Sequence, residues 1–106
     1  MPEIHQGSEP LTLINVFTVE PARQRELVAL LERATHETMC RLDGFVSASI
    51  HRSLDGKRVI NYAQWRNHAA FEAMQQRPEA QVHMKAAAAL ASFDPILCEV
   101  SSTSDR

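Results

Sequence analysis

The chain has 106 residues, of which 44% are hydrophobic and 23% charged, a size and composition typical of one globular domain and too small for two. A formal charge of -2 with no Lys/Arg-rich run argues against nucleic acid as a partner, and no apolar segment approaches the roughly 20 residues that span a bilayer. The two cysteines form no CxxC pair and the first ten residues are polar, unlike a signal peptide, so a cytoplasmic protein with reduced thiols is predicted.

The first predicted elements are an arm, a strand and a helix. Residues 1–10 mix Pro, Gly, Ser and Glu and predict a flexible N-terminal arm. Residues 11–19 are rich in β-branched and large apolar side chains and predict a strand. Pro21 is typical of a first helical turn, and apolar side chains recur at helical spacing over residues 22–42. An amphipathic helix that lies on a sheet and ends before Gly44 is therefore predicted.

The middle of the chain predicts a hairpin. Residues 45–52 and 58–66 alternate in the manner of strands, and Asp55-Gly56 between them favours the positive φ of a tight turn. Asn67 follows the second strand and is a natural N-cap for a short helix.

The last third of the chain predicts a helix and a strand. Pro78 breaks or kinks the helical pattern, and residues 79–91 then have high helix propensity. Pro95 opens a last strand over residues 96–100, and residues 101–106 form a flexible tail.

This order of elements predicts an α+β fold, the ferredoxin-like βαββαβ arrangement, over residues 11–100. In it both helices cover one face of a four-stranded antiparallel sheet. The other face would carry Ile14, Val16, Ile60 and Tyr62. In a chain this short only a second copy can cover them, so a face-to-face homodimer is predicted.

The motifs of several common chemistries are absent from the sequence. The three glycines are far apart, so no phosphate-binding loop exists, and no GxSxG nucleophile elbow is present. His36 and Cys40 lie one helical turn apart, but two ligands do not make a metal site and a third would have to come from elsewhere. Neither a metal nor an organic cofactor is predicted.

Polar side chains on an otherwise apolar strand face suggest a pocket. Asn61 shares one face of its strand with Trp65, and Asn15 lies on the corresponding face of the first strand. Because a ferredoxin-like sheet pairs these two strands, both amides are expected to face one cavity under the helices. The alternative is that Asn61 bonds neighbouring backbone and that Trp65 only fills the core.

The helices supply three further candidates. His83 lies at the edge of the apolar stripe of the last helix, from which it either reaches toward the pocket or stays at the solvent edge. Phe71 and Met74 are core residues that would also form the apolar wall of a pocket.

Several stretches carry a family resemblance: Asp55-Gly56, the string Val59-Ile60-Asn61-Tyr62-Ala63-Gln64-Trp65, Phe71, Pro78-Glu79 and His83. Together they resemble the antibiotic biosynthesis monooxygenase family over about residues 11–100, and the string Asn-Tyr-Ala-Gln-Trp is especially close to the members that oxidise polyketide anthrones to quinones. The resemblance implies a dimeric α+β barrel and an enzyme that uses molecular oxygen without flavin, haem or metal.

The resemblance also implies site residues. In the quinone-forming enzymes an Asn and a Trp of the third strand line the pocket, and these fall on Asn61 and Trp65. The family's pocket tyrosine falls on Phe71, which keeps the ring and lacks the hydroxyl. Its arginine on the last helix has no clear counterpart near residues 83–85.

The predicted function is a cofactor-independent monooxygenase that oxidises a phenolic polycyclic, anthrone-like substrate to a quinone. The Trp65 N–H and the Asn61 amide would hydrogen-bond to the enolate and the reduced oxygen. His83 would transfer the proton, because histidine gains and loses its proton near neutral pH. The predicted substrate-binding residues are Asn15, Phe71 and Met74.

Three alternatives remain open at this stage. One is a non-catalytic small aromatic ligand-binding or stress-response protein with the same fold, and another is a structural module whose pocket is filled by side chains. The third is the haem-degrading branch of the superfamily, whose Asn and His fall on Asn15 and His83. Its porphyrin-distorting Trp falls on Met74, which makes haem degradation the weaker enzymatic prediction.

Overall fold

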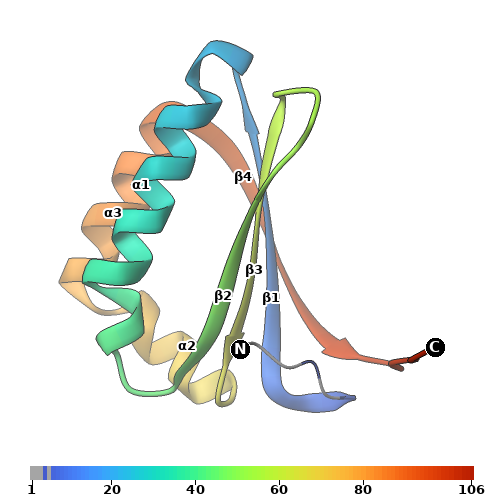
Figure 1. Ribbon diagram of the computed structural model, residues 1–106. Coiled ribbons are helices and arrows are strands. Elements are labelled where there is room, and N and C mark those ends of the chain that lie inside the picture. The colour runs from blue at the N-terminus through green and yellow to red at the C-terminus, as the bar shows by residue number, and fades with distance from the viewer. Residues whose placement is uncertain (1–3, 5) are drawn as a thin grey trace.

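The computed structural model describes residue 4 and residues 6–106. In this part of the chain, an antiparallel four-stranded sheet has its strands in the order β2-β3-β1-β4, and the helices cover one of its faces (Figure 1). The α+β, ferredoxin-like prediction is confirmed. The elements are β1 (Gly7–Val19), η1 (Pro21–Arg23), α1 (Gln24–Glu37), η2 (Met39–Arg41), β2 (Phe45–Arg52), β3 (Arg58–Trp65), α2 (His68–Gln75), α3 (Pro78–Leu90) and β4 (Ala91–Val100), where η marks a short 3-10 helix.

Strands β1 and β3 form the centre of the sheet, as predicted. Their register places Asn15 directly opposite Asn61. Because side chains alternate along a strand, residues two positions away share this face. The neighbours of the amide pair are the apolar pairs Leu13–Ala63 on one side and Phe17–Val59 on the other.

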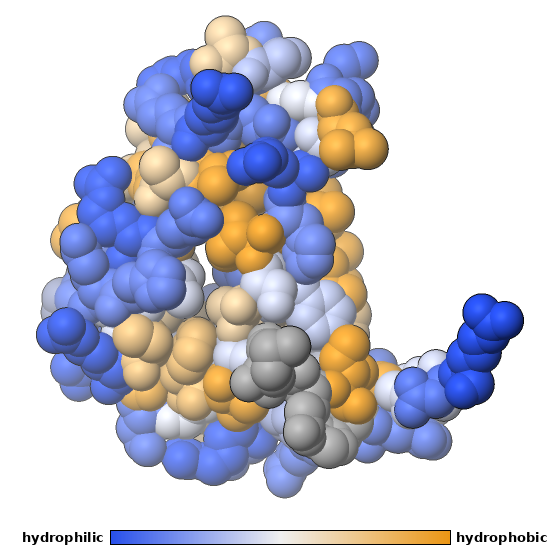
Figure 2. Space-filling model, in the orientation of Figure 1, coloured by the Kyte–Doolittle hydropathy of each residue, from blue (hydrophilic) through white to orange (hydrophobic). Residues whose placement is uncertain are grey.

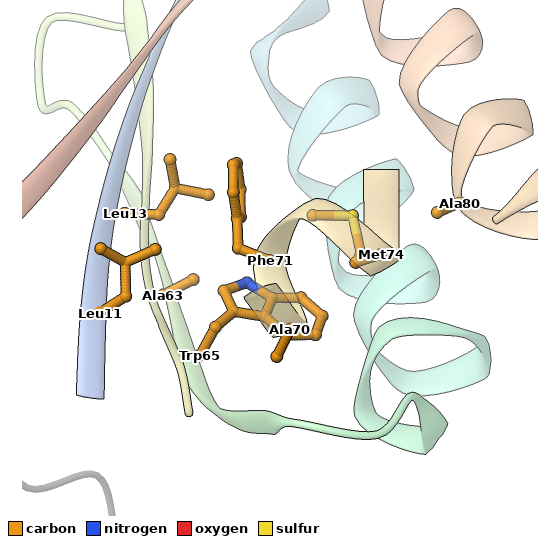
Figure 3. Packing of buried hydrophobic residues seen from close by; sticks show 8 residues of the cluster. All are labelled: Leu11, Leu13, Ala63, Trp65, Ala70, Phe71, Met74 and Ala80. Atoms are coloured by element: carbon orange, nitrogen blue, oxygen red, sulfur yellow. The ribbon is translucent and has the colours of Figure 1, made fainter. Parts of the chain in front are cut away.

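The hydrophobic core is divided in two at this amide pair. One cluster lies under α2 at one end of the sheet (Figure 3) and the other under α1 and α3 at the other end. The first contains Leu11, Leu13, Ala63, Trp65, Ala70, Phe71, Met74 and Ala80. The second contains Phe17, Val19, Leu27, Val28, Leu31, Val59 and Ala87.

The first strand is longer and the first helix shorter than predicted. β1 begins at Gly7, which pairs with Val100, and not at residue 11. A register shift between Gly7 and Thr12 accommodates Pro10, which has no N–H to donate to a ladder. Part of the predicted arm is therefore strand, and residues 1–3 and 5 lie outside the described part. The helix predicted over 22–42 is α1 with a 3-10 turn at each end.

The predicted start of the last strand is wrong. β4 begins at Ala91, directly after α3, and Pro95 lies inside it. A proline is tolerated there because β4 is an edge strand with one side free of ladder hydrogen bonds. The last helix begins at Pro78, which occupies the first helical turn. Residues 101–106 are exposed and form neither helix nor strand.

The predicted N-cap is confirmed. The Asn67 side-chain oxygen accepts a hydrogen bond from the Ala70 N–H at 2.9 Å, which satisfies one of the free donors of the first turn of α2. This contact fixes the direction in which α2 leaves the sheet and so places Phe71 and Met74 over its face.

A buried glutamine ties α1 to the hairpin. The Gln24 amide nitrogen donates to the carbonyl oxygens of Ser53 at 3.0 Å and Arg58 at 2.9 Å. We expect Gln24→Ala to lower the free energy of unfolding by about 1–3 kcal/mol, because it removes two hydrogen bonds that a buried side chain makes to the hairpin. Urea denaturation of the wild type and of Gln24→Ala provides the measurement, and Gln81→Ala is the control. Gln81 donates to one backbone oxygen at an exposed site, so equal effects of the two substitutions would contradict the prediction.

The sheet face away from the helices carries apolar side chains. Ile14, Val16, Ile60 and Tyr62 are half-buried there, and Ile96 of the neighbouring strand is 43% exposed. In the same described range, no helix is both long enough and apolar enough to cross a membrane.

Candidate active site

A cavity of about 140 Å³ lies between the helices and the sheet, at the point where the amide pair divides the core. Figure 2 shows the molecule hollowed between these two layers, with hydrophobic side chains at the opening. Most of the wall is apolar. The lining residues are Leu13, Asn15, Phe17, Leu31, Ala34, Thr35, Met39, Asn61, Phe71, Met74, Gln75, His83, Met84, Ala87, Phe93 and Pro95.

The two asparagines are the polar centre of this cavity. Asn15 and Asn61 face each other across β1 and β3, and the Oδ1 atom of each is buried without a hydrogen-bond partner. An unpartnered buried acceptor costs about 1–3 kcal/mol, so two at one place are a marked departure from ordinary packing. The expectation that both amides face one cavity is confirmed, and a ligand with hydroxyl groups would supply the missing donors.

His83 lies in the wall of the cavity and is half-buried. Its Nε2 atom lies 2.9 Å from Oγ1 of Thr38, at the end of α1. The small, buried side chains of Ala80 and Ala87 let α3 approach the sheet and α1 closely. This close approach brings His83 within reach of Thr38.

Phe71 and Met74 also lie where they were expected. Both are buried members of the cluster under α2 and both line the cavity. Figure 3 shows them projecting from α2 toward the sheet. They are thus core and cavity wall at once.

Trp65 is placed differently from the prediction. It is 2% exposed, packs edge-on against Phe45 with ring centroids 5.5 Å apart, and is not among the cavity-lining residues. It shares a strand face with Asn61, but four residues along a strand correspond to about 13 Å. Figure 3 shows the indole beside Ala70 in the α2 cluster, with its nitrogen on the edge nearest to Phe71. The structure therefore places Trp65 in the hydrophobic core, the arrangement that the sequence left as the alternative.

Several lining residues were missed from the sequence. Phe93 and Pro95 project from β4, and the ring of Phe93 lies 5.6 Å from that of Phe17. Their spacing of two residues is a strand signal that the proline obscured. Met84 follows Ala80 at helical spacing, and this stripe could have identified it. Met39 follows the end of α1, where no periodic signal extends.

The cavity wall carries no formal charge. Among the lining residues of the described chain there is no Asp, Glu, Lys or Arg, and His83 is the single histidine. Ion pairs lie on the surface instead. There the Arg66 guanidinium, which donates to Asp43 at 3.0 Å, holds the pKa of that carboxyl below its ordinary value.

No group of three or more His, Cys, Asp or Glu side chains in the described residues could hold a metal ion. His36 and Cys40 are both exposed, and the Cys40 thiol donates to the His36 carbonyl oxygen.

Comparison with known proteins decides the family. Residues 10–86 match the antibiotic biosynthesis monooxygenase family. The chain belongs to this family. The resemblance seen in the sequence is confirmed, and with it the class of enzyme, a monooxygenase.

Named relatives agree with this membership. Tetracenomycin-F1 monooxygenase of Streptomyces glaucescens is 43% identical over 101 residues, which cover 95% of this chain and 90% of the relative. The structure of the monooxygenase from the gene ActVA-Orf6 of Streptomyces coelicolor, in complex with nanaomycin D, is similar with a TM-score of 0.84 and 26% identity, covering 92% of this chain and 93% of that chain. SnoaB, a cofactor-independent oxygenase from Streptomyces nogalater, has a TM-score of 0.78 and 27% identity and covers 91% of this chain and 97% of that chain.

Proposed function

We propose that this monooxygenase oxidises a phenolic polycyclic substrate of the anthrone type to its quinone, with molecular oxygen as co-substrate and no flavin, haem or metal. The observation that carries the proposal is the pair of unpartnered amide oxygens, Asn15 and Asn61, in an uncharged apolar cavity next to one titratable side chain, His83. Two relatives support the proposal. Tetracenomycin-F1 monooxygenase is named for its substrate, tetracenomycin F1, and SnoaB is described as a cofactor-independent oxygenase.

The reaction needs no cofactor because the substrate supplies the electrons. Removal of a proton from the ring CH₂ gives a delocalised carbanion, which transfers an electron to oxygen and then forms a C–O bond as the peroxide. Loss of the second C–H proton breaks the O–O bond and leaves the C=O group and one water molecule. The balance is CH₂ plus O₂ to C=O plus H₂O.

The residues divide this work between them. His83 removes the ring proton and later returns it to the departing oxygen. The oxygens of Asn15 and Asn61 accept from phenolic O–H groups, and the N–H groups of Asn61 donate to the enolate. Phe71 and Met74 hold the flat rings.

In the proposed site, Trp65 acts through its packing. It belongs to the same buried cluster as Phe71 and Met74, so it fixes the wall against which the rings lie. Its role in the proposal is therefore to position Phe71. The hydrogen bond to the enolate, which the sequence suggested for Trp65, is not part of it.

The size of the cavity favours a flat ligand that enters edge first. An enclosed apolar cavity of about 150 Å³ is known to hold one benzene ring, so this cavity encloses about one ring of the substrate. The remaining rings extend past Phe93, which lines the cavity and is 40% exposed. SnoaB is described as a cofactor-independent oxygenase, so the relatives favour the anthrone-type substrate over the haem-degrading alternative.

The apolar outer sheet face supports the predicted homodimer. Half-buried Ile14, Val16, Ile60 and Tyr62 form a continuous surface across β1 and β3, of the kind that a second copy covers in symmetric dimers. A cytoplasmic homodimer is part of the proposal, and sedimentation equilibrium measures its mass.

Oxygen uptake tests the proposed function. Protein freed of metal by a chelator is given the anthrone dithranol, and we expect uptake above the spontaneous rate. Trp65→Phe should keep the fold and lower kcat roughly tenfold, because a small displacement of the wall misaligns the bound rings. Unchanged uptake in this variant would contradict the role of Trp65. Binding of dithranol without any uptake would favour a non-catalytic ligand-binding protein.

A further inference from the structure

The hydrogen bond between His83 and Thr38 joins two parts of the chain 45 residues apart. His83 lines the cavity and Thr38 does not. The hydroxyl group therefore holds the imidazole ring from outside the cavity.

The position of Thr38 makes its hydroxyl available for this contact. Thr38 is the N-cap residue of η2, where a threonine side chain commonly accepts a backbone N–H, yet here it makes no such capping bond. Its backbone N–H donates to the Ala34 carbonyl oxygen at 3.1 Å, which fixes the main chain at the end of α1. The β-branched side chain then has few rotamers, and its Oγ1 atom is held toward His83.

The hydrogen bond determines which nitrogen of His83 can act. In neutral imidazole one ring nitrogen carries the proton and the other accepts. With Nε2 engaged by Thr38, Nδ1 is the nitrogen left for the ligand. If the Nε2–H donates to Oγ1, Nδ1 has a free electron pair and can take a proton. If the threonine O–H donates to Nε2, Nδ1 carries a proton and cannot act as a base.

We propose that Thr38 is a positioning residue that accepts a hydrogen bond from the Nε2–H of His83 and so makes Nδ1 the base of the reaction. This inference rests on the proposed function. The substrate C–H proton moves to Nδ1, and the imidazolium keeps its Nε2–H bond to Oγ1. The same proton later returns to the departing oxygen, so His83 ends each cycle as it began.

The kinetic test uses two substitutions at position 38. Thr38→Val keeps the branched shape and removes the hydroxyl, and we expect kcat with dithranol to fall at least tenfold while KM changes less than twofold, as for loss of part of a general-base contribution. Thr38→Ser restores the hydroxyl and should recover most of kcat. Melting temperatures of both variants verify that they fold. Wild-type kcat in folded Thr38→Val would overturn the proposal.

A spectroscopic test does not depend on activity. In protein labelled with ¹⁵N-histidine, the nitrogen shifts of His83 at a pH where it is neutral should show the Nε2–H tautomer, and Thr38→Val should lose this preference. Thr35→Val is the matched control, because the Thr35 hydroxyl lies one turn earlier and donates to the Leu31 carbonyl oxygen. It should leave the tautomer of His83 unchanged.

The two tests separate this inference from the proposed function. If the wild type takes up no oxygen, the proposed function is wrong, and the tautomer still decides the role of Thr38. The Nε2–H form supports the proposal, and the Nδ1–H form overturns it. If the wild type is active and His83 carries its proton on Nδ1, the function stands and the role of Thr38 as acceptor is wrong.

Discussion

Asn61→Leu is expected to lower kcat by about 10²–10³-fold, the usual cost of losing a hydrogen bond to developing charge in an enclosed site. Leucine has the same number of side-chain heavy atoms as asparagine with the same branch point, so the position stays filled while its hydrogen-bonding groups are lost. The free energy of unfolding should stay equal or rise, because the Asn61 Oδ1 atom has no partner whose bond would be lost. Oxygen uptake and urea denaturation on the same samples measure both quantities.

Thr12→Val is the matched control for Asn61→Leu. The Thr12 hydroxyl is also buried without a partner, but it belongs to the alternate residues of β1 that face away from the helices. Its removal should likewise maintain or raise stability and should leave kcat as in the wild type. A large loss of stability in Asn61→Leu would show that the amide is structural, and the assignment of a catalytic role would then fail.

Gly44→Ala is expected to lower the free energy of unfolding by about 3–5 kcal/mol, since two costs act together. Gly44 has a φ of +88°, which side-chain-bearing residues rarely adopt, and an added Cβ would overlap the Cβ of Ala70 in α2. The Gly44 carbonyl oxygen also accepts the Arg66 N–H at 2.7 Å, so the loop cannot move away freely. Thermal unfolding gives the measurement, and the expected decrease in melting temperature exceeds about 10 °C.

Gly56→Ala separates the two costs. Gly56 has a similar φ of +80°, but an added Cβ would meet Pro21 at 3.4 Å, an ordinary contact. This variant should therefore lose about 1–2 kcal/mol, the conformational cost alone. Equal losses in both variants would mean that α2 yields to the added methyl group, and the close packing of the loop against Ala70 would then have no energetic importance.

The amide pair shows how much of the site could be predicted from sequence. Alternation along two strands placed Asn15 and Asn61 on apolar faces, and the ferredoxin-like order made those strands neighbours. Local pattern and topology together were enough, because a directly paired register follows once both faces must bury their apolar residues. The structure adds that the two residues are directly opposite and that their oxygens have no partner.

The placement of Trp65 and the contact of Thr38 could not be predicted in the same way. Alternation gives the face of a strand and not the distance along it at which a helix covers that face, so the sequence predicted one pocket for Asn61 and Trp65. Thr38 follows the last turn of α1, where helical periodicity ends, and its distance to His83 depends on how α1 and α3 pack. Such contacts depend on tertiary geometry that no local pattern records.

The methionines of the cavity wall offer a direct way to observe ligand binding. The chain has four, at positions 1, 39, 74 and 84, and the last three line the cavity. Unbranched thioether side chains adjust to ligands of different outline, so the wall can follow the shape of its substrate. Protein labelled with ¹³C at the methionine methyl groups would therefore give a spectrum of four signals, three of which report from the cavity itself.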